Sequence, residues 1–218
     1  MLEIYLQSTW ETVYMVLIST VIAGVFGIPL GIFLVITGPG GLWEKPLINK
    51  ILGLLVNIFR SIPFIILLVI LLPVTKFLVG TRIGTEAAIV PLTIAAIPFV
   101  ARLVESSLKE INRGIIEAIQ AMGATPLQII RKVLIPEATP GILLGLIITF
   151  VTLIGYSAMA GAVGGGGLGD LAIREGYQRN NMEVAWVTVV ILVIMVQLVQ
   201  SIGENLVNRI RRKRGLTL

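Results

Sequence analysis

The stretch from Thr12 to Trp43 has the sequence TVYMVLISTVIAGVFGIPLGIFLVITGPGGLW and contains no Asp, Glu, Lys or Arg. Two further runs, 138–169 and 184–203, are equally free of charged residues. The hydrocarbon core of a bilayer is about 30 Å thick, and a helix needs roughly 20 apolar residues to cross it. A soluble core does not require such uninterrupted runs. These stretches therefore predict an all-α integral membrane protein embedded in a lipid bilayer.

The composition supports this class and excludes several others. The chain is 56% hydrophobic and 13% charged, whereas soluble domains have about 25% charged residues. It has no cysteine and no histidine, which excludes disulfides, thiolate or imidazole metal sites and catalysis by a Ser–His or Cys–His pair. We therefore expect no catalytic residue, no metal site and no cofactor in this chain. We attribute the net charge of +5 to cytoplasmic Lys and Arg, not to nucleic-acid binding.

Five membrane-spanning helices are predicted within a single domain, 1–218. They cover about residues 12–36, 51–74, 84–104, 141–160 and 184–206. The second helix is long enough only if it includes Arg60. The third contains Pro91 and Pro98, which remove backbone donors and favour kinks. Gly27 and Gly31 predict a small-residue face for close packing, although glycine is also common in membrane helices generally. The first 44 residues lack the basic start of a signal peptide, so we expect the first helix to be retained.

The distribution of Lys and Arg predicts the orientation. Cytoplasmic segments of membrane proteins carry an excess of these residues. With the C-terminus inside, twelve of the 17 lie on the inner side, four lie outside and Arg60 remains within a helix. The inner residues are Lys45, Lys50, Arg102, Lys109, Arg113, Arg131, Lys132, Arg209, Arg211, Arg212, Lys213 and Arg214, and the outer ones are Lys76, Arg82, Arg174 and Arg179. Five spans then place the N-terminus outside.

A polar loop, about residues 105–137, joins the third and fourth helices on the predicted cytoplasmic side. Its apolar residues recur at spacings that predict two short amphipathic helices. Gly123 and the following residues separate them, with Thr125 as the N-cap and Pro126 as the first helical residue of the second. From composition alone, the pair could also lie flat on the membrane surface.

The residues of this loop also resemble a known pattern. Glu117-Ala118-Ile119 is followed by three residues, Gly123, nine residues and Val133-Leu134-Ile135-Pro136. This is similar to the cytoplasmic loop of ABC importer permeases, with the pattern E-A-A, three residues, G, nine residues, I-x-L-P. Ile119, Val133 and Ile135 depart from it conservatively.

Further segments extend the resemblance to most of the chain, from about Trp10 to Gly203. They resemble the permease subunit of methionine importers, although other amino-acid permeases share several of them. The segments are 59–64 (FRSIPF), 87–92 (AAIVPL), 121–126 (AMGATP) and 156–159 (YSAM) followed by the glycine-rich region 161–169.

The resemblance implies a partner and an energy source. It implies a homodimer of this chain, two separate ATP-binding subunits that use ATP and Mg²⁺, and an extracytoplasmic substrate-binding protein or lipoprotein, all at the bacterial inner membrane. Methionine is the implied cargo, and D-methionine and related derivatives are further candidates. In the family, the first short helix of the loop docks on the ATPase. The residues expected to mediate this coupling are Glu117, Ala118, Ala121, Met122, Gly123, Ala124 and Pro136.

The chain itself contains no ATPase motif. No G-x-x-x-x-G-K-[ST] sequence occurs. Residues 164–169 match G-x-G-x-x-G formally, but they follow a membrane helix and have no βαβ context, so we reject a dinucleotide site. The alternatives are a permease for another small amino acid or solute, and a self-contained carrier or channel. Inverted repeats or paired intramembrane charges would favour the latter, and neither is found in the sequence.

Five residues are candidates for the translocation pathway or its gate: Arg60, Ser61, Tyr156, Ser157 and Met159. An intramembrane cation is a functional hypothesis by default. Arg60 could attract a substrate carboxylate, hold backbone carbonyls near Pro63, or extend its charge to the inner headgroups. Met159, a flexible side chain among small residues, is the candidate gate, or simply a packing residue. The four glycines 164–167 could form a re-entrant turn or a linker.

Overall fold

The computed structural model describes residues 2–213, and within them every regular element is a helix. Arg214, one of the predicted inner cations, lies outside the described residues. In chain order the elements are α1 (Leu2–Thr37), α2 (Pro46–Ser61), α3 (Phe64–Val79), α4 (Thr85–Lys109), α5 (Arg113–Ala121), α6 (Pro126–Ile129), the π-helix η1 (Ile130–Leu134), α7 (Ile135–Gly161), α8 (Gly167–Leu171), the π-helix η2 (Ala172–Gln178) and α9 (Met182–Lys213). The predicted all-α membrane class is thus confirmed.

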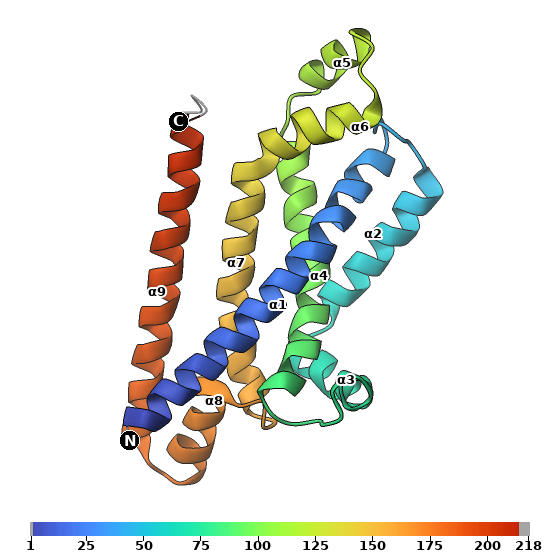
Figure 1. The fold of residues 1–218 in the computed structure, drawn as a ribbon. Coiled ribbons are helices and arrows are strands. Elements are labelled where there is room, and N and C mark those ends of the chain that lie inside the picture. The colour runs from blue at the N-terminus through green and yellow to red at the C-terminus, as the bar shows by residue number, and fades with distance from the viewer. Residues whose placement is uncertain (1, 214–218) are drawn as a thin grey trace.

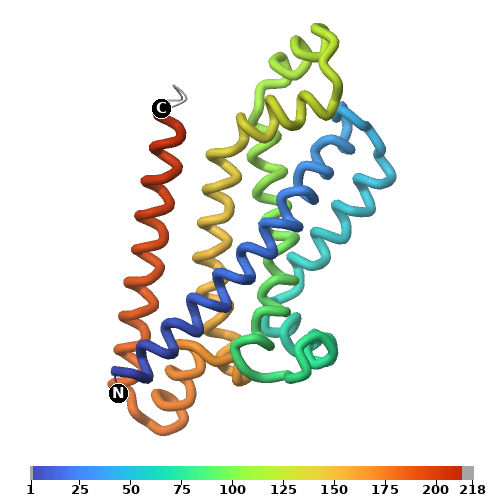
Figure 2. The backbone as a smooth tube through the Cα atoms, viewed as in Figure 1, coloured from blue at the N-terminus to red at the C-terminus, as the bar shows by residue number. Residues whose placement is uncertain are grey.

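Helix α1 packs along α4, and this pair forms the centre of the bundle. A Cβ atom on Gly27 would lie 2.7 Å from Cβ of Val100, and one on Gly31 would lie 2.6 Å from the carbonyl oxygen of Ala101. The two glycines therefore let the backbones approach each other, which confirms the predicted small-residue face. Helix α7 packs against both α1 and α4, and α9 covers α7 from the outside (Figure 2).

Four helical runs among the described residues are long and apolar enough to cross a membrane, namely α1, α4, residues 126–161 and α9. Helices α2 and α3 pass the same test only as a pair, with a bend of 106° between them. The single helix expected over 51–74 is therefore replaced by two helices. The break falls at Ile62, whose φ of −80° and ψ of 123° are extended. Pro63 disfavours the helical conformation of the residue before it, which explains the break.

The helix that ends at Gly161 begins well before the predicted fourth span. It runs from Pro126 through η1 into α7. Within η1 the backbone N–H of Ile135 donates to the carbonyl of Ile130, five residues earlier. Pro136 has no backbone N–H to donate, and such wide turns are a usual adjustment near this kind of break. The helix bends here, so that α6 lies across the end of the bundle (Figure 1).

The two ends of the bundle carry different elements. Figure 1 places α5, α6 and the C-terminal end of α9 at one end, and the N-terminal end of α1 with α3, α8 and η2 at the other. The start of α1 and the end of α9 thus lie at opposite ends of the bundle. The loop predicted to be cytoplasmic shares its end with Arg209, Arg211 and Arg212 near the end of α9.

The contact between α1 and α4 can be tested by adding one methyl group. We expect Gly31→Ala to lower the stability of the protein by about 1–3 kcal/mol, the usual effect of overpacking. Gly24→Ala on the same helix is the matched control, because its new Cβ would meet only Cδ2 of Leu146, at an ordinary 3.4 Å. Thermal unfolding of both purified variants in detergent measures the difference. Equal melting temperatures would contradict the close contact.

Candidate functional site

The polar loop folds as the predicted pair of short helices. The side chain of Asn112 accepts a hydrogen bond from the backbone N–H of Gly114 and starts α5. Gly123, with φ of 83°, follows the end of α5. Thr125 and Gln128 form a reciprocal capping box that starts α6 at Pro126. The predicted N-cap and first helical residue are confirmed, and both helix starts satisfy backbone donors that would otherwise lack partners.

Both short helices expose apolar side chains at this end of the bundle. Met122 is 77% exposed, Leu127 50% and Ile115 43%, and Ala118 and Ala121 are exposed beside them on α5. We call these five residues the docking surface, after the coupling role that the sequence resemblance implies for this loop. Ala118, Ala121 and Met122 are among the coupling residues expected from the sequence, and Ile115 and Leu127 are exposed as well. Both belong to the amphipathic pattern of the loop, but whether they are exposed depends on how α5 and α6 rest on the bundle.

Other predicted coupling residues lie behind or beside the docking surface. Ala124 is half-buried and packs against the core, and Pro136 is half-buried at the start of α7. Gly123 is exposed at the turn. Glu117 is exposed and borders a pocket of about 420 Å³ between α5, the end of α4 and the turn after α1. Glu117 therefore stands at the edge of α5, next to the rest of the bundle.

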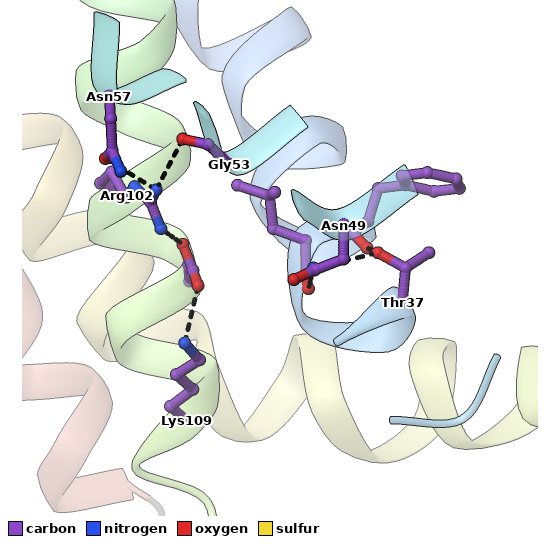
Figure 3. Close-up of polar contacts among 9 residues, drawn as sticks. Thr37, Asn49, Gly53, Asn57, Arg102 and Lys109 are labelled. Carbon is purple, nitrogen blue, oxygen red and sulfur yellow. Dashed lines mark hydrogen bonds and ion pairs between the residues drawn. The ribbon is translucent and has the colours of Figure 1, made fainter. Parts of the chain in front are cut away.

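A polar clamp joins α2 to α4 near this end (Figure 3). The guanidinium of Arg102 donates to the carbonyl of Gly53 at 3.0 Å and to Oδ1 of Asn57 at 2.8 Å. It also pairs with the carboxylate of Glu105, which is only 7% exposed and accepts a second bond from Lys109 at 2.7 Å. Arg102 was assigned to an inner loop, but it lies within α4. Its charge is partly buried and is shared among three partners.

Helix α2 is also held to α1. The side-chain amide of Asn49 donates to the carbonyl of Leu34 at 2.6 Å and to the hydroxyl of Thr37 at 3.2 Å (Figure 3). The first of these bonds satisfies a free carbonyl at the end of α1. Together with the clamp, they fix α2 to the two central helices.

A pocket of about 160 Å³ opens at the break between α2 and α3. Arg60 and Tyr156 both line it, so the structure brings together two of the predicted pathway residues. The ring of Tyr156 stacks on Phe64 with centroids 4.5 Å apart. Arg60 has no hydrogen-bond or ion-pair partner among the described residues. The pocket thus presents an unpaired cation beside aromatic and aliphatic walls.

The remaining pathway candidates lie outside this pocket. The hydroxyl of Ser61 donates to the carbonyl of Asn57 in its own helix, and that of Ser157 donates to Ile154. Ser157 is buried, whereas Met159 is 48% exposed. Met159 lies three residues beyond Tyr156 on α7, so it continues the face that lines the pocket.

Residues 2–213 contain no group of three or more acidic residues placed to hold a metal ion. What the structure offers is a multi-pass helical bundle, an exposed apolar surface at one end, and a pocket lined by Arg60, which has no partner among residues 2–213. These features define the membrane subunit of a transport system. The chain belongs to the family described as the binding-protein-dependent transport system inner membrane component, whose model matches residues 8–212.

Named relatives match nearly the whole chain. The probable D-methionine transport system permease protein of Vibrio cholerae is 58% identical over 208 residues, covering 95% of this chain and 92% of the relative. The methionine import system permease protein of Bacillus subtilis is 49% identical, with 95% and 93% covered. A solved structure of the MetNI methionine ABC transporter, described as inward facing, gives a TM-score of 0.94 at 49% identity, covering 96% of this chain and 97% of the other.

Proposed function

We propose that this chain is the permease subunit of an ABC importer for methionine. The observation that carries the proposal is the high identity to methionine permeases along almost the full length of both chains. Transporters that differ in cargo can share the fold: an amino acid ABC transporter structure gives a TM-score of 0.79 at only 19% identity. The cargo is therefore inferred from the identity, and the fold supports only the class.

The working assembly contains two copies of this chain, two ATP-binding subunits and an extracytoplasmic binding protein. The family name itself specifies dependence on a binding protein. Because the sequence has no phosphate-binding lysine motif, ATP and Mg²⁺ bind to the partner subunits. The docking surface is suited to binding such a partner, because exposed apolar side chains on a short helix can fill a hydrophobic groove on the partner's surface.

The chain crosses the bacterial inner membrane five times, with the α2–α3 pair as one broken span. The end that carries α5 faces the cytoplasm together with the basic residues at the end of α9, and the start of α1 faces outward. The excess of Lys and Arg supports this orientation. The likeness to inward-facing transporter structures supports an inward-facing conformation for the bundle.

The pocket at Arg60 contributes to the translocation path. An unpaired guanidinium is a donor for the carboxylate of an amino acid, and the walls of Phe64, Leu67 and Tyr156 suit an apolar side chain. Placing an Arg side chain at the centre of a span costs about 2.5–3.5 kcal/mol of insertion free energy. This cost supports a functional role for Arg60. Arg60 lies next to the helix break and lines the pocket.

Uptake into proteoliposomes tests the function directly. Vesicles holding this chain, its ATPase and its binding protein should accumulate labelled methionine only when ATP is supplied to the ATPase side. Unlabelled methionine should compete, and leucine should not. Uptake without ATP would indicate a carrier or channel, whereas ATP-driven uptake inhibited only by another solute would refute the cargo and keep the class.

A bulky side chain on the docking surface should release the ATPase. We expect Ala118→Trp to reduce co-purification of the ATPase about tenfold, the effect of losing about 1.4 kcal/mol of interface energy. The permease should still reach the membrane, because Ala118 is exposed at the end of the bundle. Lys132→Gln, an exposed change on η1 outside the docking surface, is the control. Normal co-purification and uptake by Ala118→Trp would contradict the assignment.

Removal of the charge at position 60 should weaken transport. We expect Arg60→Gln to lower uptake at limiting methionine about tenfold, because a hydrogen bond to a charged group contributes about 1.5–3 kcal/mol. Arg60→Lys retains the charge and should transport better than Arg60→Gln. Membrane levels of each variant are measured first. If Arg60→Gln is inserted normally and transports like the parent protein, Arg60 has no role in the path.

A further inference from the structure

Two side chains of α1 hold the start of α8, which lies 156 positions later in the sequence. Oε2 of Glu11 accepts a hydrogen bond from the backbone N–H of Gly167 at 2.8 Å. The hydroxyl oxygen of Thr12 accepts one from the N–H of Leu168 at 2.9 Å. The first N–H groups of a helix have no partner within it, and a carboxylate there is favoured by the helix dipole. Helix α1 thus provides the N-terminal cap of α8 from a distance.

Both capping groups are held in place by further hydrogen bonds. Thr12 is 1% exposed, and its hydroxyl also donates to the carbonyl of Ser8 at 3.0 Å. The other carboxylate oxygen of Glu11 accepts a bond from the side-chain amide of Gln7 at 3.1 Å. A buried donor that loses its acceptor carries the full cost of its desolvation, so this cap is not easily replaced.

Helix α8 in turn lies directly against the last turn of α7. A Cβ atom on Gly161 would overlap the backbone nitrogen of Asp170, and one on Gly169 would lie 2.5 Å from Cα of Ala158. The two helices therefore touch backbone to backbone, with no side chain between them at these glycines to absorb a shift. Met159 belongs to this same turn of α7.

The turn that connects α7 to α8 is fixed as well. Gly164, Gly166 and Gly167 all have positive φ, and the carbonyl of Gly164 accepts a hydrogen bond from the N–H of Gly84 at 2.7 Å. This bond ties the turn to the segment just before α4. The glycine-rich region 164–167 is therefore a fixed turn with defined partners.

We propose that Glu11 and Thr12 are positioning residues for the outer gate. By holding the start of α8 they fix the last turn of α7 and keep Met159 in the closed position while the pathway is open to the inside. The inference rests on the proposed transport function and on Met159 as the gate. The two residues act through α8 and need not contact the cargo.

The absence of cysteine from the chain permits a direct test. Met159→Cys is introduced alone and together with Thr12→Val or Glu11→Ala, and intact cells expressing the whole transporter are treated with a membrane-impermeant maleimide. We expect the introduced thiol to react about tenfold faster without Thr12 or Glu11 than with the intact cap, the factor given by about 1.4 kcal/mol. Thr9→Val is the matched control, since the hydroxyl of Thr9 donates to Tyr5 of its own helix. Thr12→Ser should restore slow labelling.

Hydrogen exchange of the purified complex gives a second measurement. The peptide containing Gly167 and Leu168 should exchange faster in Thr12→Val than in Thr9→Val or the parent protein. Faster exchange with unchanged maleimide labelling at position 159 would mean that α8 does not position the gate, and the proposal would be wrong. It would be equally wrong if neither measurement changed. Neither measurement uses a substrate, so a wrong cargo is detected separately by the uptake assay.

Discussion

Every buried backbone N–H and carbonyl group in a membrane must find a partner within the protein, because hydrocarbon offers none. This constraint explains why the described residues form helices throughout, and also where the helices are interrupted. At the turn after α7, Gly84 donates to Gly164, and side chains of α1 accept from Gly167 and Leu168. At the end of α1, the side-chain amide of Asn49 donates a hydrogen bond to the free carbonyl of Leu34. Each of these breaks is stabilised by a second helix, so the interruptions tie the bundle together.

Two kinds of contact hold the helices together: close backbone contact and buried charge. Gly27 and Gly31 let the backbone of α1 lie close against α4. Helix α2 depends instead on Arg102, whose partner Glu105 is nearly buried. Removing one member of a buried pair costs about 3–5 kcal/mol, because the other charge remains unpaired. Among the described residues, no equivalent clamp holds the end of α2 where Arg60 and its pocket lie. The part of α2 nearest the pocket is thus the part least restrained by polar contacts.

The sequence predicts much of this arrangement where a single helix determines it. The charge-free runs locate α1, α7 and α9, and the residues around Gly123 predict both short helices with their cap at Thr125. The break at Ile62 is a local effect of Pro63. The sequence did not reveal it, because the apolar pattern continues across the break. The caps at Glu11 and Thr12 could not be predicted, because the N–H groups that they cap lie 156 positions away in the sequence. A run of glycines also has no side-chain periodicity that would indicate a helix start. Whether Glu117 faces solvent or the bundle likewise depends on how α5 rests on the other helices.

The polar contacts described above gather at the two ends of the bundle, and this distribution limits how the cargo can be selected. The clamp and the docking surface occupy one end, and the cap of α8 occupies the other. Between them, the pocket at Arg60 offers an unpaired charge and apolar walls. A site that discriminates strongly among amino acids needs several fixed polar partners, because a hydrophobic pocket rejects a side chain with one methylene more or less by only about 1–3 kcal/mol. The proposed permease is therefore suited to passing on a cargo already selected by the binding protein. In the proposed function the permease opens and closes its two ends in turn, and the polar contacts described above lie at those ends.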